Sequence, residues 1–421
     1  MLRSIYSLAI YLAMPFIVLR LLLKSLKNPA YRQRMKERFA CITHKINTNK
    51  NIWIHAVSLG ESIAAIPLIK EIKKHFPQCA ITVTCMTPTG SQKIKQVFGN
   101  NVHHYYAPYD APILIKKFLK KIRPQLLIIM ETELWPNILH YSKKYGTKII
   151  LANARLSPKS TGGYAKISSF TKEMLNNIDL IAAQTKEDQL RFIQLGAKEN
   201  NTQNMGNIKF DLTIPENLAT KSQALRQKWG EKRKVFIAGS THQGEDEQII
   251  AAYKIVKQQI PNLLLLLVPR HPERFSTTKE LCNNNDLKII SYANKEACNV
   301  DTDVILGDIV GELLLLYGAS DIAFVGGSLV PTGGHNLLEP AAIGIPVISG
   351  PNLFNFTEIK NLLLKNQALS LVNNPHELAN VVINLFNDQE LYDLRIRQAQ
   401  KVLKQNRGAI KKLITIIKNI I

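Results

Sequence analysis

The first half of the chain places carboxylates directly after two apolar segments. Glu61 follows the segment 52–58, whereas Glu131 and Glu133 follow the segment 126–130. A carboxylate beside a buried strand is costly unless it is paired or solvated in a site. A glutamate in such a place can also act as a general base, most efficiently when its pKa is near neutral. We therefore interpret Glu61 and at least one of the other two glutamates as candidate catalytic residues.

Each of these glutamates also fits a structural role. Ser58 and Glu61 have the spacing of a capping box at the start of a helix. One of Glu131 and Glu133 could cap the helix that Pro136 begins. A helix N-terminus favours the carboxylate form, but a cap can still serve as a base. The sequence leaves both roles open for Glu61.

A glycine-rich stretch is the most informative part of the second half. It runs from a buried segment at 321–325 through two glycine pairs, at 326–327 and 333–334, into a short helix that opens at Asn336. Glycines let backbone N–H groups approach a phosphate, and the helix dipole adds a favourable charge. Glu339, one turn into this helix, could accept hydrogen bonds from ribose hydroxyls. The stretch indicates nucleotide binding, the alternative being an ordinary glycine-rich turn.

Two cations could complete these sites. Arg270 follows the apolar segment 263–269 and is suited to contact a phosphate or a base. Lys209 lies near the expected hinge between the two halves of the chain, where it could meet an anionic ligand. A lone lysine is more commonly a solvated surface residue, so Lys209 is a weak signal by itself.

Strand-like apolar segments alternate with helical segments along the chain. Strands rich in Val, Ile and Leu that alternate with helices predict parallel, doubly wound sheets. A polar stretch around 211–222 divides the pattern into two Rossmann-like units, so we expect an α/β fold with a ligand cleft between two sets of strand ends. The predicted strands are 52–58, 81–86, 102–107, 126–130, 148–154, 180–184, 235–239, 263–269, 288–291, 304–306, 321–325 and 346–349; helices are predicted at 63–75, 113–122 and 408–421, the last of them amphipathic and basic.

The N-terminal segment is apolar and has a basic flank. Residues 1–50 contain ten Lys and Arg residues against one acid, Glu37. No small-residue cleavage site follows the apolar run, which argues against a cleaved signal peptide. By the positive-inside rule the body of the protein is cytoplasmic and the segment is an uncleaved anchor. Because Arg20 can snorkel, the helix could span the membrane or lie in its interface; a buried core helix is the alternative.

Composition limits the classes of function. The chain has 421 residues, 46% of them hydrophobic, and a net charge of +22. This excludes a disordered chain, and no later apolar run is long enough to span a bilayer. The charge requires an anionic partner: nucleic acid, a membrane surface or a phosphorylated substrate. Five cysteines without paired spacing predict neither a disulfide framework nor a zinc site and indicate a reducing cytoplasm.

Two motifs that suggest a metal are discounted. Asp301-Thr302-Asp303 has the form of a metal-binding D-x-D, but it precedes a predicted strand and so lies at the wrong end for the cleft. His103 and His104 are adjacent in a strand and point to opposite faces, so they cannot chelate one ion together. We expect no metal site.

The full motif set resembles the 3-deoxy-D-manno-octulosonic acid (Kdo) transferases of lipopolysaccharide assembly. The resemblance covers nearly the whole chain and implies the GT-B fold, with an N-terminal anchor on the cytoplasmic face of the bacterial inner membrane. It also implies an inverting, metal-independent enzyme without a cofactor, which moves Kdo from CMP-Kdo to a lipid A precursor, the tetraacyl disaccharide bisphosphate. The motifs are Ser58-Leu-Gly-Glu61-Ser, Glu131-Thr-Glu-Leu-Trp-Pro136, Asn153-Ala-Arg155-Leu-Ser157, Gly206-Asn-Ile-Lys209, Ala238-Gly-Ser-Thr241, Pro269-Arg-His-Pro272 and Gly334-His-Asn336-Leu-Leu-Glu339-Pro.

The resemblance assigns roles to particular residues. Glu61 occupies the position of the general base, which removes a proton from the primary hydroxyl of the acceptor sugar. Glu131 and Lys209 occupy the positions of transition-state stabilisers. The expected domains are an anchor helix at 1–24, a basic linker at 25–50, an acceptor domain at 51–212 and a CMP-sugar-binding domain at 213–421. The CMP-binding positions are Pro269, Arg270, Val310, Gly311, Glu312, Asn336, Leu337, Leu338 and Glu339; Val310 stands where some family members carry Met.

Three other functions belong to different classes. A membrane-associated GT-B enzyme that uses a UDP-sugar would share the fold and the anchor. A nucleic-acid-binding protein would explain the charge, but aromatics make up only 7% of the residues and are not interleaved with the basic ones. A scaffold with a dead site would not need the full set of site residues. Much of the positive charge lies near the two termini, which predicts attraction to anionic inner-membrane lipids rather than to nucleic acid.

Overall fold

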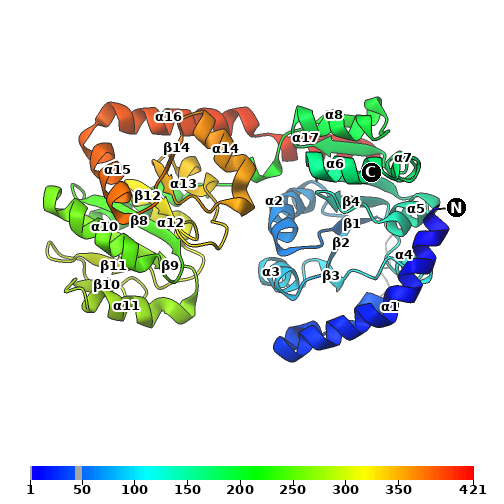
Figure 1. Cartoon of the computed structure of the whole chain (residues 1–421), viewed down its shortest axis with the longest axis horizontal. Coiled ribbons are helices and arrows are strands. Elements are labelled where there is room, and N and C mark those ends of the chain that lie inside the picture. The colour runs from blue at the N-terminus through cyan, green and yellow to red at the C-terminus, as the bar shows by residue number, and fades with distance from the viewer. Residues whose placement is uncertain (1, 43–49) are drawn as a thin grey trace. The chain divides into compact units, whose positions relative to one another are not determined.

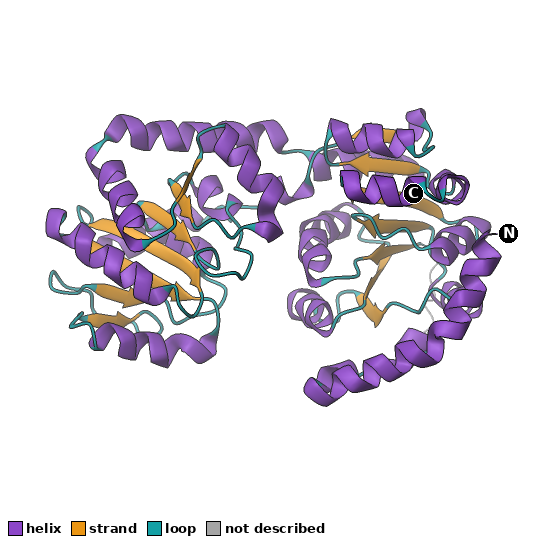
Figure 2. Cartoon of the chain, in the orientation of Figure 1, coloured by secondary structure: helices purple, strands orange, loops and turns teal. Residues whose placement is uncertain are grey.

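The computed structural model describes residues 2–42 and 50–421, which form two compact units. The first unit comprises residues up to Asp211 together with Asn406–Ile421, and the second comprises Leu212–Gln405. Each is built around a seven-stranded sheet whose strands alternate with helices along the chain (Figure 1, Figure 2). All strand pairs are parallel. The α/β, doubly wound architecture is therefore confirmed for both units.

The sheet of the first unit has the strand order β3-β2-β1-β4-β5-β6-β7. β1 pairs with β2 on one side and with β4 on the other, so the direction of strand succession reverses at β1. Open α/β sheets bind ligands at such a reversal, outside the carboxyl ends of the strands. The strands are β1 (Asn51–His55), β2 (Ala80–Cys85), β3 (His103–Tyr106), β4 (Leu126–Met130), β5 (Lys148–Ala154), β6 (Leu180–Ala183) and β7 (Thr202–Asn204).

Apolar side chains cover both faces of this sheet. Ile52 and Ile54 of β1 face one core and Trp53 faces the other, as the alternation of a strand requires. Helices α2, α3 and α17 close the first core, and α4, α5, α7 and α8 close the second. The helices are α1 (Leu2–Lys27), α2 (Leu59–His75), α3 (Pro88–Phe98), α4 (Pro112–Ile122), α5 (Pro136–Lys144), α6 (Pro158–Ala165), α7 (Ser168–Asn176), α8 (Lys186–Gln194) and α17 (Ala409–Ile420), with short 3-10 turns at Pro29–Tyr31, Met35–Phe39, Glu199–Asn201 and Ile208–Phe210.

Residues 406–421 belong to the first unit. This differs from the prediction, which placed them in a second domain at 213–421. The predicted basic helix at the C-terminus forms as α17, and its apolar face packs on α2. Ile410, Leu413 and Ile417 are buried in the same core as the strands of the first sheet. The lysines on the opposite face of α17 are exposed. An amphipathic pattern alone did not indicate which unit this helix completes.

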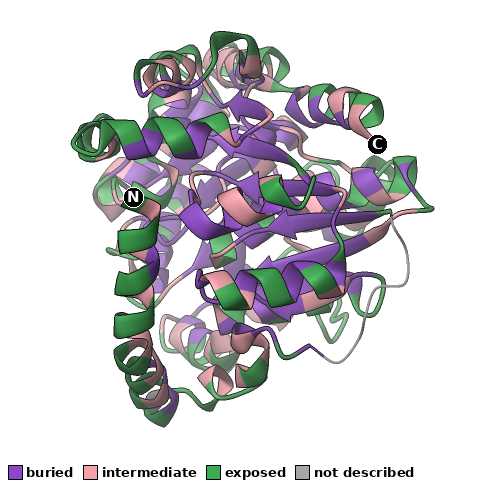
Figure 3. Ribbon diagram, turned by 90° about the vertical axis from the view of Figure 1, so that its right-hand side faces the viewer, coloured by how far each residue is buried: buried purple, intermediate pink, exposed green. Residues whose placement is uncertain are grey.

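Helix α1 carries an exposed apolar face. Within the described residues, it is the one helix that is long and apolar enough to cross a membrane. Few of its residues are buried, which contradicts the alternative of a core helix (Figure 3). Its exposed large side chains recur three or four positions apart and so form one stripe. This apolar stripe consists of Ile5, Leu8, Leu12, Phe16, Leu19, Leu23 and Leu26.

The other face of α1 contacts the body of the first unit. Arg3 donates to Asn137 Oδ1 at 3.2 Å, and Ser7 Oγ donates to the same oxygen at 3.1 Å. Farther along, Tyr11 Oη accepts from the backbone N–H of Ile113 at 3.3 Å. The first half of α1 is therefore held on α4 and α5 by polar contacts.

The basic segment after α1 is packed, in contrast to the linker expected at 25–50. Arg38 is only 1% exposed, and its guanidinium lies 4.1 Å from the ring centroid of Tyr106. It also donates to the carbonyl of Met86 at 2.9 Å. Part of the expected linker, residues 43–49, lies outside the described residues.

The second unit repeats the same design. Its strand order is β10-β11-β9-β8-β12-β13-β14, so the reversal lies between β8 and β12. Helices α10, α11 and α15 cover one face, and α9 and α12 cover the other. The strands are β8 (Lys234–Thr241), β9 (Leu263–Pro269), β10 (Ile289–Ser291), β11 (Val304–Leu306), β12 (Ile322–Val325), β13 (Val347–Ser349) and β14 (Leu369–Leu371). The helices are α9 (Leu218–Trp229), α10 (Asp246–Gln259), α11 (Phe275–Asn283), α12 (Leu313–Gly318), α13 (Leu338–Ile343), α14 (Thr357–Lys365), α15 (Pro375–Asn387) and α16 (Gln389–Asn406), with 3-10 turns at Pro272–Arg274 and Phe354–Phe356.

Candidate active site

Glu61 lies in the first turn of α2, at the carboxyl end of β1. Its backbone N–H donates to Ser58 Oγ at 3.2 Å, and Ser58 Oγ donates to Glu61 Oε1 at 2.7 Å. Glu61 Oε2 accepts from the N–H of Val57 at 2.7 Å. The capping interaction predicted from the sequence is therefore present, and it fixes the rotamer of the carboxylate.

The carboxyl group of Glu61 has a perturbed pKa. Burial raises the pKa of Glu61 to about 7; the Ser58 hydroxyl opposes this rise, and nearby Glu133 adds to it. Desolvation therefore outweighs the capping hydrogen bonds. A carboxyl group that titrates near neutrality is about half ionised at neutral pH, which is the condition for efficient general base catalysis. Cap and candidate base are combined in one side chain.

Glu131 lies directly after β4, beside the end of β1. Its φ of +57° places it in the left-handed region, which costs a non-glycine residue about 1 kcal/mol or more. The strained backbone directs a carboxylate that is 9% exposed toward two cations. Arg155 Nε lies 3.0 Å from Glu131 Oε2, and Lys209 Nζ lies 3.6 Å from Glu131 Oε1. The structure thus brings together Glu131 and Lys209, two residues that the sequence separates widely.

Neither glutamate after β4 caps the following helix. The N-cap position of α5 is Trp135, which makes no side-chain cap. Asp110, from the loop before α4, accepts instead from the N–H groups of Asn137 at 3.0 Å and Ile138 at 2.8 Å. Glu133 Oε2 accepts from Trp135 Nε1 at 2.7 Å. The structural alternative for the two glutamates is therefore wrong, because a distant aspartate does the capping.

A polar network fixes the segment that carries Lys209. The side chain of Asn207 accepts from the Lys209 N–H at 3.0 Å and donates to Gln184 Oε1 at 2.9 Å. Asn153 Oδ1 accepts from the N–H of Ile208 at 3.1 Å. These contacts connect the ends of β5, β6 and β7 and determine where Lys209 can lie. Arg155, which follows β5, was given no role by sequence reasoning, although its motif was noted.

In the second unit, one buried carboxylate organises the glycine-rich loop after β12. Glu245 is fully buried, and its Oε1 accepts from the N–H groups of Ser328 at 2.8 Å and Leu329 at 2.9 Å. Its Oε2 accepts from Gly327 at 2.6 Å and from His242 at 2.9 Å. Backbone N–H groups of the loop that the sequence indicated as phosphate donors therefore already donate to Glu245. The sequence offered no signal for this residue, which lies far from the loop along the chain.

The cluster most suited to a nucleotide lies at the second half of that loop. Asn336 Nδ2 donates to Glu339 Oε1 at 3.1 Å. Burial raises the pKa of Glu339, while Asn336 and the positive charge of Arg270 lower it. Leu337 and Leu338 are fully buried, so these two predicted contacts can reach a ligand only through their backbone.

The remaining predicted contacts lie at neighbouring strand ends. Pro269 is the last residue of β9 and pairs with Thr241 of β8. Val310 is 66% exposed, and Gly311 has a φ of +97°. Glu312 is the N-cap residue of α12, and its carboxylate accepts from the hydroxyl of Tyr292 at 2.8 Å. All nine predicted CMP positions thus belong to the second unit.

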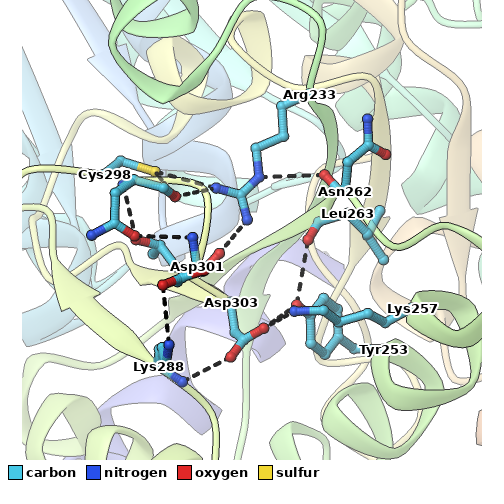
Figure 4. A network of polar contacts seen from close by, with 11 residues as sticks. Arg233, Tyr253, Lys257, Asn262, Leu263, Lys288, Cys298, Asp301 and Asp303 are labelled. Carbon is cyan, nitrogen blue, oxygen red and sulfur yellow. Dashed lines mark hydrogen bonds and ion pairs between the residues drawn. The ribbon is translucent and has the colours of Figure 1, made fainter.

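The D-x-D segment has a structural role (Figure 4). Asp303 accepts from Tyr253 Oη at 3.1 Å and from the N–H of Lys288 at 2.9 Å, and it forms an ion pair with Lys257. Asp301 pairs with the Lys288 ammonium at 3.3 Å. Both carboxylates therefore have protein partners. Within residues 2–42 and 50–421, no group of three or more His, Cys, Asp or Glu side chains is placed to hold a metal ion.

Comparisons with known proteins agree with this division into two units. A family model described as 3-deoxy-D-manno-octulosonic-acid transferase matches residues 33–212, and a model described as glycosyl transferases group 1 matches residues 221–402. A 3-deoxy-D-manno-octulosonic acid transferase from Haemophilus influenzae is 42% identical over 418 residues, which cover 99% of this chain and 98% of that protein.

Solved structures resemble the chain as well. The C-terminal CMP-Kdo binding domain of WaaA from Acinetobacter baumannii is 34% identical, with a TM-score of 0.44, over 45% of this chain and 99% of that one. HepE from Anabaena, solved in complex with UDP, is 16% identical with a TM-score of 0.55, over 88% of this chain and 100% of that one. The likeness to HepE concerns the fold alone, two Rossmann-like domains of the GT-B class. The family model and the full-length relative together show that the chain is a glycosyltransferase that belongs to the 3-deoxy-D-manno-octulosonic acid transferase family.

Proposed function

We propose that this protein transfers Kdo from CMP-Kdo to a lipid A precursor, the tetraacyl disaccharide bisphosphate, with inversion at the anomeric carbon. The observation that carries the proposal is Glu61, a buried carboxyl group whose pKa is raised to about 7 at the strand reversal of the unit that matches the Kdo transferase model. Its position suits the removal of a proton from an acceptor hydroxyl at neutral pH.

The chemistry assigns a step to each candidate residue. Glu61 takes the proton of the acceptor hydroxyl as the oxygen attacks the anomeric carbon of Kdo from the face opposite CMP. Negative charge then builds on the departing CMP phosphate, and preorganised cations reduce the cost of this charge. Lys209, held by Glu131, is available either to that phosphate or to the Kdo carboxylate.

The second unit is proposed to hold the donor. Arg270 suits the phosphate, because a guanidinium presents several N–H donors to anionic oxygens. Glu339 suits the ribose hydroxyls, and Asn336 keeps its carboxyl group oriented at 3.1 Å. Pro269, Val310, Gly311 and Glu312 complete the proposed CMP site, together with the backbone of Leu337 and Leu338.

We also propose that α1 associates with the cytoplasmic face of the inner membrane. The apolar stripe of α1 faces away from the unit, where it can enter the acyl region of a bilayer. Arg3 and Ser7 at the start of the helix are hydrogen-bonded to Asn137 of the body. A helix whose first turns remain on the body favours an orientation in the plane of the interface over a full crossing. Exposed lysines of α17 add an attraction for anionic lipids.

Product analysis tests the reaction. The full-length protein is incubated with CMP-Kdo and tetra-acylated lipid A precursor, and the products are identified by mass spectrometry. An added Kdo mass on the precursor is expected, and it should depend on Glu61 but not on Glu71, a partly exposed glutamate of the same helix. Stabilisation of the protein by UDP but not by CMP, without any Kdo product, would instead favour a GT-B enzyme that uses a UDP-sugar.

A further inference from the structure

Three histidines meet at the carboxyl edge of the second sheet, and none has a role in the proposed reaction. His242 follows β8, His271 follows β9 and His335 lies in the glycine-rich loop after β12. The ring centroids of His242 and His271 are 5.3 Å apart and those of His242 and His335 are 5.1 Å apart. The cluster borders Arg270 and Asn336, which lie in the proposed CMP site.

His242 and His335 form a direct hydrogen bond between their rings. The two Nε2 atoms are 2.8 Å apart, and the ring planes differ by only 13°. The two Nε2 atoms are much closer together than the two ring centroids, so each ring points its Nε2 atom at the other ring. The rings therefore lie edge to edge in nearly parallel planes and are not stacked face to face. Because one nitrogen must donate and the other must accept, the pair holds a single proton between its two Nε2 atoms.

The groups around the pair keep it neutral in the free protein. Burial and then the charge of Arg270 lower the pKa of His335 to about 3, with His242 and His271 adding to the effect. Burial also lowers the pKa of His242; Glu245 opposes this, and the neighbouring histidine and arginines reinforce it. The carboxylate of Glu245 is, however, saturated by four backbone N–H groups.

Two arginines lie next to the pair, and they differ in their partners. Arg274 is paired with the buried Asp246 and donates to the carbonyl of Thr241 at 3.1 Å. Arg270 is exposed and, among the described residues, makes no ion pair. Its guanidinium is therefore available to an anion. Burial is the largest cause of the low pKa of both rings, and an anion beside Arg270 would oppose it by offsetting the charge of that arginine.

We propose that Arg270 and the His242–His335 pair form the subsite for the phosphate of the donor nucleotide, and that the pair takes up one proton when the phosphate binds. The phosphate oxygens accept hydrogen bonds from Arg270. Their negative charge stabilises the imidazolium that forms on one of the two rings, while the other ring accepts the hydrogen bond between the two Nε2 atoms. The inference deepens the proposed function and rests on it, since it assumes that the second unit holds a nucleotide.

Proton binding by the pair and phosphate binding strengthen each other. The pair has a higher proton affinity in the complex than in the free protein. Phosphate affinity is therefore greatest below the pKa of the pair in the free protein and decreases as the pH rises from there toward the pKa of the bound state. The advantage is lost as the pH rises through that pKa, by up to about tenfold per pH unit for one proton.

The test uses the full-length protein and ligands whose own charge is constant. Cytidine 5′-phosphate methyl ester keeps one negative charge from pH 6 to 8.5, and cytidine lacks the phosphate. Calorimetry in two buffers of different ionisation enthalpy measures proton uptake directly. For the wild-type protein we expect uptake of up to one proton with the ester, none with cytidine, and affinity for the ester that rises as the pH falls.

Three variants complete the design. In His335→Gln and His242→Gln, affinity for the ester should fall at least tenfold at pH 6.5 and proton uptake should vanish, whereas cytidine binding should stay within twofold and thereby report an intact fold. His376→Gln, an exposed histidine in α15, should behave as wild type.

The outcomes separate this inference from the function it rests on. Unchanged proton uptake in both pair variants would overturn it while Kdo transfer still supported the proposed function. Proton uptake with free Kdo but not with the ester would also overturn it, since the anion would then be the sugar carboxylate. A wild-type protein that binds neither cytidine ligand and transfers no Kdo would overturn the proposed function itself.

Discussion

Lys209 Nζ lies 3.6 Å from Glu131 Oε1, so the cation expected to meet an anionic ligand is held by a carboxylate of its own unit. Glu131 is shared with Arg155 at 3.0 Å, and both cations therefore remain near the strand ends without a ligand. The proposed role of Lys209 fits this arrangement, because positive charge that is positioned in advance reduces the reorganisation that a reaction requires.

Replacement of Lys209 tests this role. Lys209→Met removes the cation but keeps most of the side-chain volume, and Glu131 retains Arg155. We expect Kdo transfer to fall by about 10²-fold, while unfolding free energy falls by about 1 kcal/mol or less because the pair is partly solvated. Transfer rates and urea unfolding curves measure the two effects. Lys198→Met, an exposed lysine of the same unit, is the control. Equal transfer by both variants would remove Lys209 from the mechanism.

The raised pKa of Glu61 predicts the pH dependence of transfer. A base must be ionised, so kcat should rise with pH through about 7 and level off above it. Glu61→Gln should lower kcat by about 10²- to 10⁴-fold and leave CMP affinity unchanged. Glu71→Gln should keep both the wild-type rate and the wild-type pH profile. A Glu61→Gln variant that still showed half of the wild-type rate would argue against the base assignment.

Glu245 should control the stability of the glycine-rich loop. Glu245→Gln retains the shape but replaces one acceptor oxygen by an NH₂ group that faces N–H donors. Two buried backbone N–H groups then lose their acceptor, at about 1–3 kcal/mol each. We expect a lower unfolding midpoint and weaker CMP binding. Glu247→Gln, exposed on the same helix, should change neither quantity. Wild-type CMP affinity in Glu245→Gln would show that the loop keeps its conformation without the carboxylate.

The apolar stripe of α1 should determine membrane association. Leu12 and Phe16 are 68% and 73% exposed, so aspartates at these positions should fold normally but oppose insertion. The double variant is expected to bind vesicles that contain anionic lipid much more weakly than wild type, as measured by flotation. Val300→Asp changes an even more exposed apolar residue, in the second unit, and should bind as wild type. Flotation of the double variant at the wild-type level would exclude the stripe as the membrane contact.

The orientation of α1 is tested separately. In a variant without native cysteines, single cysteines at Leu2 and Leu26 are labelled with an impermeant maleimide in inside-out vesicles. An in-plane helix exposes both positions to the same compartment, whereas a spanning helix exposes only one.

Helix α17 should contribute to the stability of the first unit. Leu413→Ala removes a fully buried side chain from its core and should cost about 2–5 kcal/mol of unfolding free energy. Lys411→Ala, on the exposed face of the same helix, should stay within about 0.5 kcal/mol of wild type. Urea unfolding followed by fluorescence measures both. A loss below 0.5 kcal/mol for Leu413→Ala would mean that α17 contributes little to this core.

Much of the fold followed from local patterns, and the strands that the sequence did not predict lack such a pattern. Runs such as Leu126–Met130 and Val304–Leu306 are apolar enough to specify buried strands with their observed bounds. The strands β7 and β14 were not predicted, because three-residue edge strands such as Thr202–Asn204 have too little apolar periodicity.

The residues of the candidate site also differ in whether the sequence could indicate them. Glu61, Glu131 and Arg270 could be identified because each follows a strong strand signal. Glu245 and Asp110 could not, because their partners are backbone N–H groups remote in the chain and no side-chain pattern encodes such a contact.

The return of α17 to the first unit has a consequence for biosynthesis. The strands of the first sheet are translated before the second unit, but Ile410, Leu413 and Ile417 of the same core are translated after it. The second unit, an insertion between Asp211 and Asn406, has its full sequence available earlier. The second unit can therefore fold before the core of the unit that contains Glu61 is complete. Termination of translation after the second unit would therefore leave the first core without the apolar face of α17.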